Sequence, residues 1–169
     1  DLDSVPPEIV AEMEAAGVAI HRYLARKDQT DLELALEVAI AEKPDEILLL
    51  TALGGRLDHT LANIFLLAHP KYASVRFTLV DGSQWAMLLR SHQSVTIEGQ
   101  PGDTLSLIPL SPTVSRVTLT GVEWPLEKVT LSLGSTWTIS NALADHRVTL
   151  QIGEGMVLLV HFDKYHEEN

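Results

Sequence analysis

The stretch EILLLTALGGRLDHTLANIFLL, residues 46–67, decides the fold of the first half of the chain. It opens with a short apolar run that is typical of a buried parallel strand. Gly54 and Gly55 then turn the chain into a segment with a helical pattern. A strand, a tight turn and a helix in this order form the repeating unit of a parallel sheet covered by helices.

The neighbouring segments continue this alternation of helix and strand. We expect a helix over residues 4–17, a strand over residues 18–24, a helix from Thr30 to the residue before Pro44, and a strand over residues 75–80. The order of these segments predicts an α/β domain with a parallel sheet.

From about residue 85 onward the pattern changes to short strands. Alternating segments follow at short spacing, among them SVTIE, DTLSLI, VTLTGV, VTLSL, TWTIS, RVTLQI and MVLLVHF. Turn residues separate them and no long helical pattern intervenes, which is typical of a β-sandwich or barrel. We therefore predict an α/β domain over residues 1–84, an all-β sandwich domain over residues 85–169, and no continuous sheet across that boundary.

The composition excludes several classes of function. The chain carries 23 acidic against 12 basic residues, a formal net charge of -11, which argues against non-specific binding to nucleic acid or an anionic membrane. It has no cysteine, which excludes disulfides and thiol nucleophiles and fits a reducing cytoplasm, where we expect the protein. No run of about 18 apolar residues occurs, so we expect no membrane span. A ligand with phosphates would need a divalent cation to shield it from these carboxylates.

Polar residues gather at three of the predicted junctions that lead into helices. These clusters are DLDS at residues 1–4, KDQTD at residues 27–31, and GGRLDHTLAN at residues 54–63. Lys27 and Arg56 lie near helix N-termini, where a positive charge opposes the helix dipole unless an anion is nearby. Because the carboxyl ends of parallel strands share one edge, acids for Mg²⁺ and bases for phosphate indicate phosphoryl transfer there. In the structural alternative, the acids only stabilise helix N-termini, and His59 and Asn63 face solvent.

A fourth cluster lies in the β half, in GVEWPL at residues 121–126 and GSTWTISNA at residues 134–142. Trp124 and Trp137 are candidates either for the core or for stacking on a ligand. We expect the hydroxyls of Thr138 and Ser140 to share one face of a strand, beside Asn141. Together these groups could give a flat heteroaromatic ligand its hydrogen-bond partners.

The succession DLDS, KDQTD, GGRLDHTLAN, GVEWPL and GSTWTISN resembles the thiamine pyrophosphokinase family, also called thiamine diphosphokinase. The resemblance covers nearly the whole chain, with the motifs in family order. It implies a Rossmann-like three-layer catalytic domain followed by a β-sandwich domain, working as a homodimer with active sites at the interface. It also implies transfer of pyrophosphate from ATP to thiamine, giving thiamine diphosphate and AMP, with Mg²⁺ as cofactor.

The resemblance assigns roles to the residues at matching positions. The catalytic residues would be Asp1, Asp3, Asp31 and Arg56, the first three of them as Mg²⁺ ligands. The ATP site would be lined by Lys27, Asp28, Thr30, Arg56, Asp58, His59 and Asn63. Thiamine would be bound by Thr138, Ser140 and Asn141, with Trp124 or Trp137 as a wall of the pocket.

The chain departs from the family pattern at its start. Family members begin with a strand and a nucleotide-site DGG segment before a G-D-x-D-S motif, whereas this sequence starts at the first Asp of that motif. We therefore expect a catalytic domain that is incomplete at its N-terminus. Two alternatives stay open: a pyrophosphokinase for another heterocyclic alcohol such as hydroxymethylpterin, and a non-catalytic thiamine-binding fragment.

Overall fold

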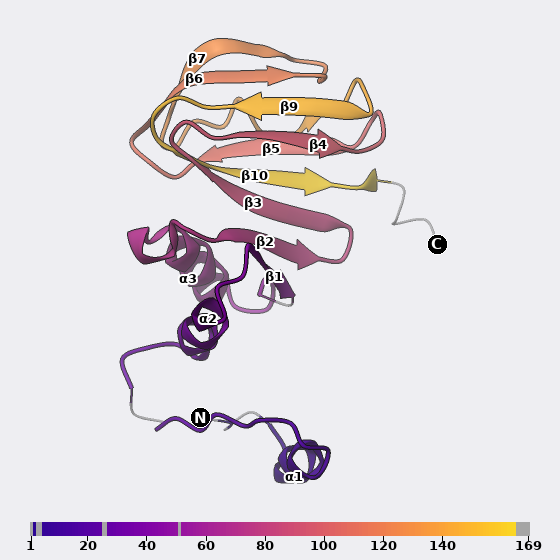
Figure 1. Cartoon of the computed structure of the whole chain (residues 1–169). Coiled ribbons are helices and arrows are strands. Elements are labelled where there is room, and N and C mark those ends of the chain that lie inside the picture. The colour runs from indigo at the N-terminus through magenta and orange to yellow at the C-terminus, as the bar shows by residue number, and fades with distance from the viewer. Residues whose placement is uncertain (1, 3–4, 25–26, 51, 165–169) are drawn as a thin grey trace. The chain divides into compact units, whose positions relative to one another are not determined.

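A computed structural model of the chain describes residue 2 and residues 5–24, 27–50 and 52–164 (Figure 1). The chain divides into two compact units, Asp1–Lys43 and Pro44–Asn169. Within the described ranges, no helix is long and apolar enough to cross a membrane.

The described residues of the first unit form two helices, α1 (Pro7–Ala15) and α2 (Asp31–Ala41). α1 starts with a proline, whose missing N–H would have no partner in the first turn of a helix anyway. α2 begins where the sequence predicted, because the Thr30 hydroxyl accepts a hydrogen bond from the Glu33 amide at 3.2 Å. The predicted strand over residues 18–24 is wrong. Those residues have no strand to pair with among the described residues of this unit, and an unpaired extended segment is not a strand.

The second unit opens with the strand, turn and helix that its sequence predicts. Its first elements are β1 (Glu46–Leu50), α3 (Leu57–Ala68), the 3-10 helix η1 (Pro70–Tyr72) and β2 (Arg76–Asp81). β1 and β2 pair in parallel, with α3 as the connection between them. The α/β part of the predicted fold class is therefore confirmed.

The rest of the second unit consists of short strands in two sheets. They are β3 (Gln84–Arg90), β4 (Ser94–Glu98), β5 (Thr104–Pro109), β6 (Thr113–Thr120), β7 (Leu126–Ser132), β8 (Asn141–Ala142), β9 (Arg147–Gln151) and β10 (Met156–Phe162). One sheet has the order β1-β2-β3-β10-β5-β8 and the other the order β4-β9-β6-β7 (Figure 1). Leu105 and Leu159 of the first sheet and Val117 and Val148 of the second are 0% exposed and belong to one core. The predicted β-sandwich is confirmed.

The first sheet runs through the predicted domain boundary. Asp81 lies opposite Gln84 in the pairing of β2 with β3, so only two residues form the turn between these strands. Gly82 supplies the left-handed main chain that such a hairpin turn requires, with φ of 58°. The expectation of no continuous sheet is therefore wrong, because a two-residue turn lays β3 along the open edge of β2. The division into domains at residue 84 stays a prediction.

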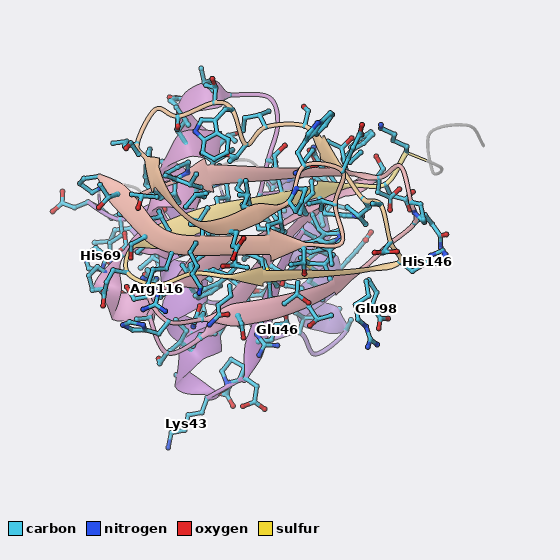
Figure 2. All side chains as sticks on the ribbon, turned by 90° about the horizontal axis from the view of Figure 1, so that it is seen from above. Lys43, Glu46, His69, Glu98, Arg116 and His146 are labelled. Carbon is cyan, nitrogen blue, oxygen red and sulfur yellow. The ribbon has the colours of Figure 1, made fainter. Side chains whose placement is uncertain are left out.

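A buried polar pair lies between the ends of β5 and β10. Asp103 and His161 are 1% and 4% exposed, and Asp103 Oδ2 is 3.2 Å from His161 Nε2. The Trp85 ring stacks on the imidazole with 5.2 Å between ring centroids. Glu98 lines one pocket with this pair and another pocket with His146, and Figure 2 labels Glu98 and His146 on one side of the sandwich. Trp85 also packs against the hydrophobic core, so the indole contacts both the core and the polar pair.

Candidate functional site

Arg56 stands directly before α3 as its N-cap residue, with an extended main chain. Its guanidinium donates from Nε to Asp58 Oδ1 at 3.1 Å and from Nη2 to Asp58 Oδ2 at 2.5 Å. Asp58 Oδ1 also accepts the main-chain amide hydrogen of His59 at 3.0 Å. The Arg56 and Asp58 side chains are 70% and 64% exposed, so a ligand from solvent can reach the pair.

The pair sets the charge of this junction. Hydrogen bonding to Arg56 lowers the pKa of Asp58 to about 2, and the same contact raises the pKa of Arg56. At neutral pH the carboxylate is therefore ionised, and the two charges cancel. A phosphate can use the guanidinium only by sharing its N–H groups with Asp58 or by displacing the carboxylate.

Two polar side chains of α3 reach back to the loop that precedes the helix. Asn63 Nδ2 donates to the carbonyl oxygen of Ala52 at 2.7 Å, and the Gly54 amide donates to Thr60 Oγ1 at 3.3 Å. The amide of Asn63, a residue expected to line the ATP site, is thus bonded to the main chain. Sequence reasoning missed Thr60, although its place three residues before Asn63 on one helical face was a usable signal.

The second predicted cluster lies in the first unit, at the start of α2. Lys27 and Asp31 form an ion pair four residues apart, and hydrogen bonding to Lys27 lowers the pKa of Asp31. The Asp31 carboxylate is therefore ionised at neutral pH, with its side chain 64% exposed. Thr30 caps the helix through its hydroxyl, and Asp28 is exposed.

The predicted Mg²⁺ ligands are only partly covered by the structure. Asp1, Asp3 and the neighbouring Ser4 lie outside the described residues. Among the residues that are described, no three His, Cys, Asp or Glu side chains come together in a group that could hold a metal ion. Asp31 is thus the one predicted ligand whose surroundings the described part of the chain includes.

In the β half, four of the predicted thiamine-site residues line one small pocket. Its lining consists of Trp124, Trp137, Thr138 and Asn141 with Leu119, Leu126 and Ile139. Trp124 and Trp137 are 59% and 58% exposed, so neither is a core residue. The cavity of about 60 Å³ is far smaller than the roughly 300–1,000 Å³ of pockets that enclose small molecules. The indoles therefore form one wall of a site rather than a closed pocket.

The segment TWTIS, residues 136–140, is not the predicted strand. It contains turns, and the main chain of Ser140 is left-handed with φ of 60°. Thr138 is buried and donates its hydroxyl hydrogen to the Leu107 carbonyl oxygen at 2.7 Å, whereas Ser140 is exposed. The expectation that these two hydroxyls share one face is therefore wrong, because the turn breaks the alternation of a strand.

Asn141 fixes the main chain of Trp124. Its Oδ1 accepts from the Trp124 amide at 3.1 Å, and its Nδ2 donates to the Trp124 carbonyl oxygen at 2.8 Å. Oδ1 also accepts from the Ala142 amide at 2.9 Å. The carboxamide is 7% exposed and joins the two motifs that the sequence singled out in the β half. Asn141 therefore shapes the pocket by holding one of its indoles.

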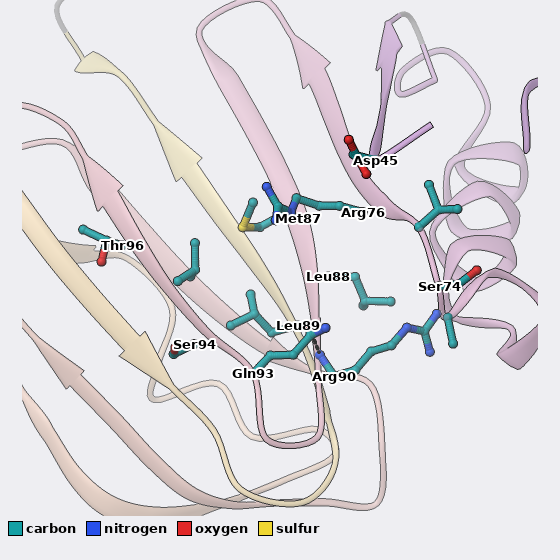
Figure 3. Close-up of a pocket in the computed structure, with 13 residues that line it drawn as sticks. Asp45, Ser74, Arg76, Met87, Leu88, Leu89, Arg90, Gln93, Ser94 and Thr96 are labelled. Atoms are coloured by element: carbon teal, nitrogen blue, oxygen red, sulfur yellow. Dashed lines mark hydrogen bonds between the residues drawn. The ribbon is translucent and has the colours of Figure 1, made fainter. Parts of the chain in front are cut away.

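Another pocket, of about 460 Å³, contains none of the predicted site residues (Figure 3). Arg76 and Arg90 both line it, but Figure 3 shows the Arg90 guanidinium turned toward the helix beside β2. Arg90 donates to the carbonyl oxygens of Leu67 and Ala68, at the C-terminal end of α3, at 2.8 and 3.2 Å. Burial lowers the pKa of this guanidinium. A cation at a helix C-terminus is well placed, so Arg90 ties α3 to β3.

Comparison with known proteins covers both halves of the chain. The family model described as "Thiamin pyrophosphokinase, catalytic domain" matches residues 1–79, and "Thiamin pyrophosphokinase, vitamin B1 binding domain" matches residues 92–157. Thiamine pyrophosphokinase of Bacillus subtilis is 34% identical over 160 residues, which are 95% of this chain and 75% of that protein. Thiamine pyrophosphokinase 1 of rice is 28% identical over 89% of this chain and 60% of its own length.

The fold agrees with the solved structure of one of these proteins. The crystal structure of thiamine pyrophosphokinase from Bacillus subtilis superposes with a TM-score of 0.85 at 34% identity, over 97% of this chain and 76% of that one. These matches confirm the predicted fold class and the predicted enzyme family. With both family models matched in order along one sequence, the chain belongs to the thiamine pyrophosphokinase family.

Proposed function

We propose that this chain transfers a pyrophosphoryl group from ATP to the hydroxyl of thiamine, giving thiamine diphosphate and AMP. The observation that carries the proposal is the match of a catalytic and a vitamin B1 binding family model, in order, on a single chain. The identity of 34% to a named thiamine pyrophosphokinase over 95% of the chain supports it. The exposed guanidinium before α3 and the pocket with two exposed indoles are consistent with an anionic and a heteroaromatic substrate.

The reaction divides into bond changes and charge stabilisation. The thiamine hydroxyl oxygen forms a bond to the β-phosphorus of ATP, the bond from that phosphorus to the bridging oxygen of AMP breaks, and a carboxylate accepts the hydroxyl proton. Arg56 and Lys27 would stabilise the negative charge that grows on the phosphate oxygens. Thr30, Asp28, Asp58, His59 and Asn63 remain the proposed surroundings of ATP. Orientation of the two substrates should supply much of the acceleration.

Mg²⁺ is the proposed cofactor, with Asp1, Asp3 and Asp31 as its ligands. Asp31 fits this role, because its carboxylate is exposed and ionised at neutral pH, and hydrogen bonding to Lys27 lowers its pKa below the ordinary value. Carboxylate oxygens are the protein ligands that Mg²⁺ prefers. When bound, the ion would neutralise charge on the phosphates, which the net charge of -11 would otherwise repel.

Thiamine is proposed to lie against Trp124 and Trp137. Their exposed faces offer stacking surface, and the exposed hydroxyl of Ser140 offers a hydrogen bond. The side chains of Thr138 and Asn141 make their hydrogen bonds to main-chain groups of this chain. They would therefore shape the wall of the thiamine site by van der Waals contact rather than by hydrogen bonds to the ligand. Replacing the Ser140 hydroxyl should therefore affect thiamine binding more directly than ATP binding.

A homodimer with the active site at its interface is the proposed assembly. A cavity of about 60 Å³ needs further walls to enclose thiamine, and the exposed Leu133 and Ile139 lie close to Trp137 in the sequence. Light scattering on the purified chain would measure the mass, and a monomer at all concentrations would refute the dimer. A cytoplasmic location stays part of the proposal.

The activity is tested by incubating the chain with Mg-ATP and thiamine and measuring AMP and thiamine diphosphate. We expect the two products in equal amounts. Turnover with hydroxymethylpterin and none with thiamine would select a pyrophosphokinase for another heterocyclic alcohol. Saturable thiamine binding without AMP formation would select a non-catalytic thiamine-binding protein.

A further inference from the structure

The loop between β1 and α3 is tied to the helix by two side chains three residues apart. Asn63 donates to the Ala52 carbonyl oxygen at 2.7 Å, and Thr60 Oγ1 accepts from the Gly54 amide at 3.3 Å. Both side chains are half-buried, whereas residues 54–59 are all exposed. The loop therefore takes these two bonds from the side of α3 that is turned away from solvent.

Packing does little to hold the two glycines of this loop. Gly54 and Gly55 have left-handed main chains with φ of 100° and 61°, and a β-carbon added to either would meet no atom within 4 Å. The glycines are thus needed for their conformation and not for a close approach. A loop of two glycines in open space has much conformational freedom to lose, so the hydrogen bonds from α3 decide its shape.

These bonds lead directly to Arg56. The Arg56 amide donates to the Gly54 carbonyl oxygen at 2.8 Å, and the Thr60 amide donates to the Arg56 carbonyl oxygen at 3.1 Å. Thr60 therefore binds the main chain on both sides of Gly55, once through its hydroxyl and once through its amide. Moving Gly54 moves the main chain from which the guanidinium extends.

We propose that Thr60 and Asn63 are positioning residues that fix the loop over residues 52–56 and so direct the Arg56 guanidinium toward the phosphates of ATP. That ATP binds beside Arg56 rests on the proposed function. That α3 fixes the loop rests on the hydrogen bonds alone. Asn63 then acts on the ATP site through the main chain of this loop. Because misplacing a charge-stabilising group by about 1 Å can cost roughly 100-fold in rate, loosening the loop should weaken the site.

The test uses Thr60→Val, which removes the hydroxyl at nearly constant shape, and Thr60→Ser as its matched control. Amide hydrogen exchange of Gly54, followed by NMR, should be faster in Thr60→Val than in wild type and unchanged in Thr60→Ser. The Kd for Mg-ATP, measured by calorimetry without thiamine, should rise about 10-fold in Thr60→Val. The KM for thiamine should not change. Asn63→Asp places a carboxylate oxygen against the Ala52 carbonyl oxygen, and it should also raise the Kd for Mg-ATP.

A double-mutant cycle separates positioning from a general structural effect. In an Arg56→Ala background, Thr60→Val should cause no further loss of ATP affinity, because the residue through which it acts is absent. Additive losses, or Gly54 exchange in Thr60→Val equal to that of wild type, would overturn the proposal. Absence of ATP binding by the wild-type chain would instead overturn the proposed function, while Gly54 exchange would still report whether α3 fixes the loop.

Discussion

The carboxylate of Asp58 binds both Nε and Nη2 of Arg56, at 3.1 and 2.5 Å, across the first turn of α3. The sequence places a positive charge at this helix N-terminus, where it opposes the helix dipole, and the structure shows that Asp58 compensates that charge. The residue expected to bind phosphate is therefore already aligned by a carboxylate of its own chain. This alignment favours one orientation of the planar guanidinium before any ligand arrives.

Replacing Arg56 with Gln should raise the pKa of Asp58 from about 2 toward its ordinary value of 3.8. The pair lowers the pKa in the folded state, so the stabilisation that it contributes is present above pH 3.8 and lost as the pH falls toward 2. Both side chains are exposed, and the effect on overall stability should be small. The pKa of Asp58 is measured in both proteins from the NMR chemical shift of its carboxyl carbon as a function of pH. Identical titration curves would contradict the pairing in solution.

Replacing Asp31 with Asn should lower turnover by about 100-fold or more, the loss expected when a group that stabilises transition-state charge is removed. The reason is that the variant has no ionised carboxylate to offer to Mg²⁺ at this position. AMP formation from Mg-ATP and thiamine gives the rate. Glu42→Gln, at the exposed end of α2, is the control for folding and should keep the wild-type rate. Near-normal turnover of Asp31→Asn would remove Asp31 from the metal site.

Replacing Arg90 with Met should lower the free energy of unfolding by about 1–3 kcal/mol, because the carbonyl oxygens of Leu67 and Ala68 lose a charged donor. Arg76→Met is the matched control, since Arg76 lines the same pocket but is exposed (Figure 3). That variant should stay within about 0.5 kcal/mol of wild type. Urea denaturation measures both values. Equal effects of the two substitutions would show that Arg90 does not anchor α3.

Replacing Asn141 with Ala should lower the free energy of unfolding by about 1–3 kcal/mol, because it leaves the main chain of Trp124 without its partners. Ser140→Ala, next to it but exposed, should leave stability unchanged. The Ser140 variant should instead raise the KM for thiamine more than the KM for ATP. Thermal melting and steady-state kinetics of the two variants test this division. An unchanged melting temperature for Asn141→Ala would contradict the structural role of its carboxamide.

The strongly patterned elements of this chain are readable from the sequence. MVLLVHF becomes β10 with the predicted bounds, Thr30 caps α2, and the stretch from residue 46 forms β1, its turn and α3. In each case the signal is local, because strand alternation, helix capping and glycine turns act over a few neighbouring residues. The family motifs add the order of the two halves, which the comparisons confirm.

The wrong predictions concern whether a segment pairs with a neighbouring strand. Residues 18–24 have a strand pattern but no strand beside them among the described residues of their unit. TWTIS alternates like a strand, yet the left-handed main chain at Ser140 turns it. β3 joins the sheet of β1 and β2 because the open edge of β2 lies within reach of a two-residue turn. Pairing depends on which edges are open in space, and local periodicity carries no information about that.

The sequence by itself indicated the family and the two-part fold, which the comparisons confirm, and it supplied the polar residues of the candidate site as a prediction. Only the tertiary structure decided what those side chains touch: Asp58 binds Arg56, Asn63 binds the Ala52 carbonyl, and Asn141 binds the main chain of Trp124. The physical reason is that hydrogen-bonding capacity belongs to the residue type, whereas the choice of partner depends on distances that exist only after the chain has folded.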